Sequence, residues 1–261
     1  MVTGYNVHAN DIRQHLICYE GKGPDLLVVP GITSPAITWG FVAERLSEYY
    51  NVHVLDVRGR GLSQAGDLDY SLEAMADDII ALVDTGYFNK PLVLGHSMGA
   101  RTAIRAAAKS PDSFSGLLLI DLPVSGPGRR EYPSQWSWYE DSIVMAQKGC
   151  SAEEMKSFCP TWSEEQLTVR AEWLHTCQLD AIDTTYKGFH TDDIHKDIPH
   201  LKLPLRLVVA GGAPVINDDD VQEILELAPH AEVRVIDGAG HMIPWDDLEG
   251  FLSAVTDFAA A

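Results

Sequence analysis

The chain has 261 residues, of which 46% are hydrophobic and 22% are charged, and its formal net charge is −19. A charge this negative disfavours nucleic acid and anionic membranes as partners, because both are bound through basic faces. It also means that an anionic small-molecule substrate would have to be attracted by local arginines against the overall field.

Neither a targeting segment nor a metal-binding pattern is evident. Residues 1–6 have no basic start and no apolar run, so no signal peptide is expected, and no apolar stretch approaches the roughly 20 residues of a membrane span. Cys18, Cys150, Cys159 and Cys177 lack both Cys-x-x-Cys pairing and zinc spacing, which indicates reduced thiols. We therefore expect a cytoplasmic protein with no metal and no other cofactor.

Short apolar runs alternate with amphipathic stretches along most of the chain, which is typical of a mainly parallel sheet covered by helices. The first 20 residues predict a hairpin in which residues 5–9 pair with 11–20. Buried strands are then expected at 26–29, 52–55, 92–94, 117–120, 205–210 and 233–236. Helices are expected at 39–49, 72–83, 98–109, 219–227 and 248–258. The fold class is therefore α/β, with an eight-stranded sheet flanked by helices.

Residues 125–200 break this alternation. They are rich in large aromatic residues and contain short helix-like segments at 142–147, 152–158 and 164–174. We predict that they form a helical cap, inserted between core segments 1–124 and 201–261, that closes over the active site. Most of its aromatic residues are expected to form the core of the cap, whereas a few, with Trp138 and Tyr139 as candidates, face the pocket.

The sequence Gly95-His96-Ser97-Met98-Gly99 follows an expected strand and opens an expected helix. In that setting Gly-x-Ser-x-Gly predicts a tight, strained turn, in which small residues flank the serine and its hydroxyl is presented at a helix N-terminus. We interpret Ser97 as the nucleophile of a hydrolase.

A serine hydroxyl needs a base to take its proton, and the chain offers ten histidines. His241 has the most suitable setting, because it lies in a glycine-containing loop between the last strand and the last helix, at the carboxyl edge of the sheet. His96 is interpreted as a packing residue. His175, in the predicted cap, is a candidate for contact with the substrate.

The base in turn needs an acid that orients its ring. The commonest position, shortly after the strand at 205–210, holds Pro214. Asp218 and its neighbours resemble the start of a helix, where acids favour the dipole, whereas Asp121 ends the strand beside the nucleophile strand. We favour Asp121; the alternatives are that it only caps the strand exit, or that the acid lies at 218–220.

Two backbone amides are expected to bind the oxyanion that forms on attack. One belongs to Met98, directly after the nucleophile, and the other to Ile32, after the first buried strand, where Gly31 allows a close backbone approach. The glycine-containing segment 56–63 lacks the spacing of a nucleotide-binding loop. It is interpreted as a structural turn in which Arg58 ties loops together.

With these motifs in order, the whole chain resembles the α/β-hydrolase superfamily. More narrowly, residues 30–41 (PGITSPAITWGF), 123–130 (PVSGPGRR), 170–177 (RAEWLHTC) and 240–247 (GHMIPWDD) resemble the deformylase family of bacterial nicotinate and pyridine degradation. The resemblance implies an α/β-hydrolase fold with a helical cap, a triad acid after the sixth strand, and hydrolysis of N-formylmaleamate to maleamate and formate. Composition and spacing by themselves do not name that substrate.

A small anionic amide of this kind needs a cation or several donors for its carboxylate. Arg129 and Arg130 at the start of the cap are candidates, with His175 and the polar groups of Trp138 and Tyr139. Two other functions stay open: an esterase or carbon–carbon bond hydrolase acting on a small ring-cleavage product, and a non-catalytic ligand receptor built on the same fold. Nothing in the sequence indicates an oligomeric state.

Overall fold

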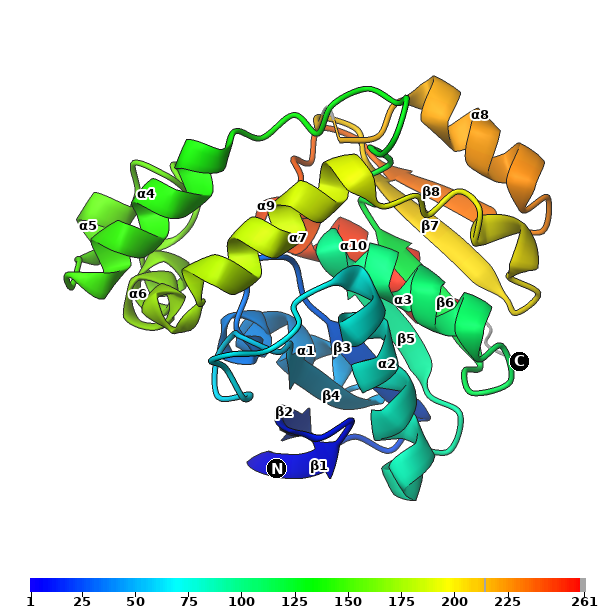
Figure 1. Cartoon of the computed structure of the whole chain (residues 1–261), viewed down its shortest axis with the longest axis horizontal. Coiled ribbons are helices and arrows are strands. Elements are labelled where there is room, and N and C mark those ends of the chain that lie inside the picture. Colours follow the sequence, from blue (N-terminus) through cyan, green and yellow to red (C-terminus); the bar gives the residue numbers. More distant parts are fainter. Residues whose placement is uncertain (214, 259–261) are drawn as a thin grey trace.

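A twisted sheet of eight strands forms the centre of the molecule (Figure 1). The computed structural model describes residues 1–213 and 215–258. The strand order is β1-β2-β4-β3-β5-β6-β7-β8, and every neighbouring pair from β4 to β8 is parallel. The strands are β1 (Val2–Ala9), β2 (Ile12–Tyr19), β3 (Asp25–Val29), β4 (Asn51–Asp56), β5 (Leu92–His96), β6 (Gly116–Ile120), β7 (Leu205–Ala210) and β8 (Glu232–Ile236). The predicted α/β class and eight-stranded sheet are confirmed.

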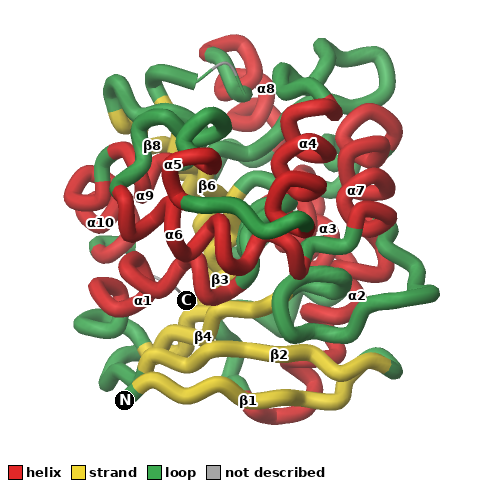
Figure 2. Tube along the Cα trace, turned by 90° about the vertical axis from the view of Figure 1, so that its left-hand side faces the viewer, coloured by secondary structure: helices red, strands yellow, loops and turns green. Residues whose placement is uncertain are grey.

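The hairpin of β1 and β2 lies at one edge of the sheet (Figure 2). Its two strands pair antiparallel, with Val2 opposite Tyr19 and Ala9 opposite Ile12. The chain reverses at Asn10 and Asp11, both of which have positive φ, a conformation that these two residue types tolerate better than most.

Alternate residues of the central strands face two different layers of helices. Leu27 and Val29 belong to one apolar cluster, with residues of α2, α3 and α8, whereas Leu26 and Val28 belong to a second, with residues of α1 and α10. Side chains of a strand point to opposite faces in turn, so a strand covered on both faces is apolar throughout. These helices are α1 (Gly40–Leu46), α2 (Leu72–Leu82), α3 (Met98–Lys109), α8 (Asp218–Leu227) and α10 (Leu248–Thr256).

Between β6 and β7 the chain forms four helices that extend to one side of the sheet (Figure 1). Ser151 and Ser163 cap two of them by accepting from the third helical amide, as their Ser-x-x-Glu and Ser-x-x-Gln patterns favour. The fourth was not anticipated from the sequence. These helices are α4 (Trp136–Gln147), α5 (Ala152–Met155), α6 (Glu164–Trp173) and α7 (Leu179–Thr191).

Short helical turns complete the described chain. They are η1 (Ala36–Trp39), η2 (Val83–Tyr87), η3 (Leu174–Thr176), η4 (Ile198–His200) and α9 (Ile243–Asp246). In the ranges 1–213 and 215–258, no helix combines the length and apolarity that crossing a membrane requires.

A buried arginine ties the two ends of the helical insertion together. Arg101 of α3 is 2% exposed. Its guanidinium donates to the carbonyl oxygens of Pro123 and Ser125 at 2.9 and 2.8 Å, and to those of Gly188 and Asp192 at 3.2 and 2.8 Å. Because one cation satisfies carbonyls at both ends, the insertion is held at a fixed place over α3.

Candidate active site

Ser97 lies in a strained turn between β5 and α3. Its φ of 54° and ψ of −115° are rarely adopted by residues other than glycine. A Cβ on Gly95 would lie 2.4 Å from the carbonyl oxygen of Gly99, and one on Gly99 would lie 1.9 Å from that of Val29. Only glycine fits at either position, which gives the Gly-x-Ser-x-Gly spacing its physical reason.

His241 approaches the serine from the loop after β8. Its Nε2 lies 2.9 Å from Oγ of Ser97, a distance suited to proton transfer. A hydrogen bond of 2.9 Å from the amide of Gly240 to the carboxylate of Asp246 stabilises this loop. The histidine selected from the sequence therefore reaches the selected serine.

Asp121 completes the arrangement from the end of β6. Its Oδ2 accepts from Nδ1 of His241 at 2.6 Å and its Oδ1 accepts from the amide of Ala210 at 3.2 Å, with the side chain fully buried. Asp218, the rejected candidate, is exposed at the start of α8, and Pro214 lies outside the described residues. The structure thus brings Ser97, His241 and Asp121 together in the geometry of a Ser-His-Asp triad.

His96, interpreted from the sequence as a packing residue, has a more specific place. Its Nε2 lies 2.9 Å from the main-chain oxygen of His241 and, since a carbonyl only accepts, must carry a proton. Burial lowers the pKa of His96 to about 3, so the ring is neutral and its Nδ1 is an acceptor, without a partner in the described chain. His96 supports the backbone of His241.

The two predicted oxyanion amides lie in the expected settings. Met98 is the first residue of α3, where helix amides have no intrahelical acceptor. Ile32 follows β3 in a turn closed by a bond of 3.2 Å from the amide of Ser34 to the carbonyl of Gly31. Buried Arg60 donates to the carbonyl of Ile32 at 3.1 Å and fixes the next peptide group. Their role as oxyanion donors stays a prediction.

Arg58 ties loops together, as the segment 56–63 indicated. Its guanidinium forms two bonds of 2.5 Å with Asp78 of α2 and one of 2.5 Å with the carbonyl of Asp69. Asp56, at the start of the segment, accepts from the amides of Ala36 and Leu62 at 2.6 and 2.9 Å. These contacts stabilise the loops beside the turn at 31–34.

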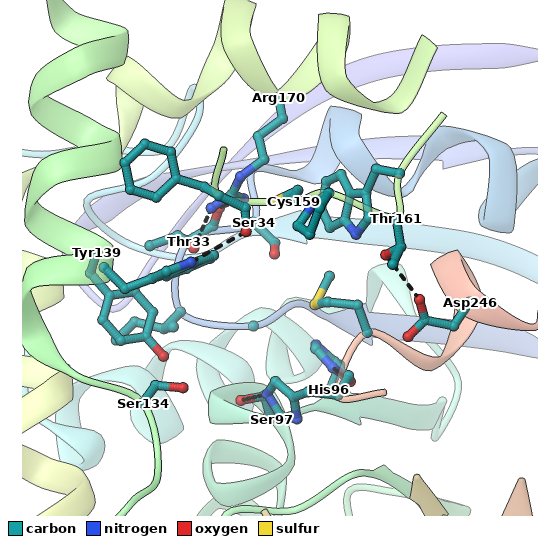
Figure 3. Close-up of a pocket in the computed structure, with 18 of the residues that line it drawn as sticks. Thr33, Ser34, His96, Ser97, Ser134, Tyr139, Cys159, Thr161, Arg170 and Asp246 are labelled. Carbon is teal, nitrogen blue, oxygen red and sulfur yellow. Dashed lines mark hydrogen bonds between the residues drawn. The ribbon is translucent and has the colours of Figure 1, made fainter. Parts of the chain in front are cut away.

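A cavity of about 430 Å³ opens above the serine (Figure 3). Its floor includes Ser97 and His241, and one wall is the turn 31–34. Most of the remainder comes from the helical insertion, with Met242 and Asp246 contributed by the segment after β8. The candidates Trp138 and Tyr139 both line it. The other residues that the insertion contributes are Ser134, Gln135, Phe158, Cys159, Pro160, Thr161, Trp162 and Arg170.

A family model described as the alpha/beta hydrolase family matches residues 26–254. The chain belongs to the alpha/beta hydrolase family. Among curated hydrolases of this kind, it is 56% identical over 258 residues to N-formylmaleamate deformylase of Pseudomonas putida, covering 98% of this chain and 96% of that one. It is 37% identical over 253 residues to 2-(acetamidomethylene)succinate hydrolase of Mesorhizobium japonicum, covering 93% and 90%.

A solved structure agrees with this placement in the alpha/beta hydrolase family. The chain is similar to the crystal structure of an N-formylmaleamic acid deformylase from Pseudomonas putida, a serine-to-alanine variant. The TM-score is 0.95 at 63% sequence identity, covering 97% of this chain and all of the other. The predicted resemblance to the deformylase family is confirmed.

The sequence predicted that Arg129 and Arg130 contact the substrate. In this hydrolase, however, both arginines form ion pairs away from the cavity. Arg129 forms two bonds of 2.6 Å with Glu223, and Arg130 binds Asp220. Both carboxylates belong to α8, and neither arginine is among the residues around the cavity. Their charges fasten the start of the insertion to the core. His175 is also absent from the cavity wall, because it lies exposed in η3.

Two residues near the serine or the cavity of this hydrolase were missed in the sequence. Tyr132 is 3% exposed, accepts from the hydroxyl of Tyr139 at 3.2 Å, and has Ser97 among the polar neighbours of its own hydroxyl. Burial raises its pKa, so it stays a neutral donor. The other is Arg170, in the quoted segment 170–177. No local signal separates either residue from an ordinary cap residue, since only packing brings them here.

Proposed function

We propose that this chain hydrolyses N-formylmaleamate to maleamate and formate, with Ser97 as the nucleophile. The observation that carries the proposal is the chain of bonds from Ser97 through His241 to Asp121, of 2.9 and 2.6 Å, at the floor of a cavity of about 430 Å³. The reaction class is supported by 56% identity over nearly the whole chain to a deformylase.

In the first step Ser97 Oγ attacks the formyl carbon while His241 Nε2 takes the hydroxyl proton. The carbonyl oxygen becomes an oxyanion, for which the amides of Ile32 and Met98 are the proposed donors; one such donor is worth about 3 kcal/mol of barrier. Asp121 keeps the proton on Nδ1 of His241 and stabilises the imidazolium. When the carbon–nitrogen bond breaks, His241 returns its proton to the leaving nitrogen, and maleamate departs.

The second step repeats the first with water. His241 takes a proton from water, which attacks the formyl ester on Ser97. The ester bond breaks, the serine oxygen recovers a proton from His241, and formate is released. Because the acyl group is a single carbon, the acyl side needs little room. We infer that most of the cavity of about 430 Å³ serves the maleamate portion.

The proposed partner is therefore a small anionic amide, with neither nucleic acid nor membrane involved. The proposed location is the cytoplasm, in keeping with four free thiols, of which Cys159 and Cys177 are buried. The proposed chemistry uses side chains and backbone amides of this chain and assigns no step to a metal or other cofactor.

The test measures hydrolysis by the purified protein through the acid that each substrate releases: formate from N-formylmaleamate, acetate from 2-(acetamidomethylene)succinate, and the corresponding acids from simple esters and ring-cleavage products. We expect N-formylmaleamate to have the highest kcat/KM, and Ser97→Ala to lose turnover while Ser110→Ala, a control on the far end of α3, retains it. Preference for an ester or a carbon–carbon bond would favour the first alternative. Tight binding without turnover would favour the receptor.

A further inference from the structure

Arg170 carries a buried positive charge that no nearby acidic side chain neutralises. It belongs to α6 and is 3% exposed. Its guanidinium donates to the carbonyl oxygen of Thr33 at 3.3 Å and to the hydroxyl of Thr33 at 3.4 Å. Throughout residues 1–213 and 215–258, no carboxylate lies within 4.0 Å of it. A buried charge is costly unless it is paired, so this one calls for an anion.

Aromatic rings hold this guanidinium in place. Its Cζ lies 5.3 Å from the ring centroid of Trp138 and 5.5 Å from that of Trp162. Such contacts stabilise an arginine without using its hydrogen-bond donors. The two threonine bonds are long, and the Nε of Arg170 is buried without any partner in the described chain. The side chain is therefore fixed and has donor capacity to spare.

The guanidinium faces the reaction cavity. Arg170 lines it, and Figure 3 shows Arg170 and Ser97 on opposite sides of the space. Its partner Thr33 directly follows Ile32, the proposed oxyanion donor, and neighbouring Cα atoms are about 3.8 Å apart. An anion bound by Arg170 would therefore belong to a short molecule whose other end reaches the serine.

Other charged side chains near the cavity are already engaged. Asp246 lines it, but one carboxylate oxygen accepts from the amide of Gly240 at 2.9 Å and the other from the hydroxyl of Thr161 at 3.4 Å. Arg129 and Arg130 are paired with acids of α8. Among the described residues around the cavity, Arg170 is the one lysine or arginine.

We propose that Arg170 binds the carboxylate of the substrate and makes the enzyme selective for anionic N-formyl amides. This inference rests on the proposed deformylase function. An arginine fork donates charge-assisted hydrogen bonds to a carboxylate, and the enclosing tryptophan rings exclude water, which strengthens them. The Arg170 guanidinium also allows a chain with a net charge of −19 to bind an anion. Its attraction acts at short range, whereas the repelling negative charges are distributed over the surface.

The test compares two substrates that differ in the carboxylate alone. These are N-formylmaleamate and (Z)-N-formylbut-2-enamide, in which a methyl group replaces the carboxylate. For Arg170→Met we expect kcat/KM to fall about 100-fold with the anion and to stay unchanged with the neutral amide. Arg170→Lys should lose less, because it keeps the charge without the fork. Arg129→Gln, a matched loss of one paired cation, should leave both values unchanged.

The outcomes separate the two proposals. No formate from either substrate with the wild-type protein would overturn the deformylase function itself. Equal losses on both substrates in Arg170→Met, with wild-type function intact, would overturn the carboxylate role alone and mark Arg170 as a structural residue.

A binding measurement covers the case in which Arg170→Met does not fold. Calorimetry with Ser97→Ala protein should show binding of maleamate and much weaker binding of (Z)-but-2-enamide, its neutral counterpart. Arg170→Lys in the same background should weaken maleamate binding and leave the neutral amide unaffected. Equal affinity for the two compounds would contradict the proposal.

Discussion

Nε2 of His96 lies 2.9 Å from the main-chain oxygen of His241, so the residue before the proposed nucleophile supports the backbone of the proposed base. The two rings are 5.0 Å apart, and Gly31 leaves room for His96, because a Cβ there would lie 2.9 Å from its Nδ1. The turn that holds Ser97, the turn at 31–34 and the loop that holds His241 therefore meet around one buried neutral imidazole.

Removing that support should slow catalysis without weakening substrate binding. For His96→Leu we expect kcat to fall about tenfold, the equivalent of one hydrogen bond, with KM unchanged. His96→Gln should recover part of the loss, because its amide can donate to the same carbonyl. Steady-state kinetics of both variants check this, and a loss confined to KM would contradict the positioning role.

The same imidazole should make stability depend on pH in a defined direction. Burial lowers the pKa of His96 from 6.5 to about 3, so below pH 6.5 the unfolded chain binds a proton that the folded chain does not. The free energy of unfolding should therefore fall as the pH drops from 6.5 towards 3, by up to about 1.4 kcal/mol per pH unit from this group.

Urea unfolding of wild-type protein and His96→Gln across this range isolates the contribution. Burial raises the pKa of Asp56 to about 6, which acts in the opposite direction, but both proteins share it. The wild-type curve should be steeper on the acid side. Parallel curves would show that His96 does not titrate differently on unfolding.

Asp121 should matter far more than the acids of α8. For Asp121→Asn we expect kcat to fall about 10³- to 10⁴-fold, because the amide no longer holds the required tautomer of His241. Asp218→Asn, at an exposed helix start, should change kcat little. Formate release by the two variants decides between them, and the reverse ranking would move the triad acid to the later loop.

The serine turn should tolerate no Cβ at Gly99. Alanine there would place its Cβ 1.9 Å from the carbonyl oxygen of Val29, so the backbone must shift. We expect Gly99→Ala to lower the free energy of unfolding by about 3 kcal/mol or more. Gly149→Ala is the control: its φ is 82° but nothing lies within 4 Å, so it should cost about 1 kcal/mol. Similar losses in thermal unfolding would contradict the steric argument.

The sequence was most informative where local pattern and chain order determine position. Strands read as continuous apolar runs, since both faces of this sheet are covered. Ser97 was recognisable because its glycines are required by contacts within the turn. Asp121 and His241 could be inferred because parallel strands place their carboxyl ends along one edge, so residues that follow those strands meet. The helix α7 was missed, because the residues that it buries were decided by how the helix packs within the insertion and not by a clear pattern along the sequence.

The tertiary structure alone decided which arginine lines the cavity. Arg129 and Arg130 looked suitable as adjacent cations at the start of the cap, yet they pair with Glu223 and Asp220, about 90 residues later. Arg170 looked ordinary, yet it is buried between aromatic rings without an acid. The availability of a charge depends on which partners the fold brings to it. The sequence by itself determined the candidate triad residues and their order, and the packing determined which arginine without an acidic partner lines the cavity.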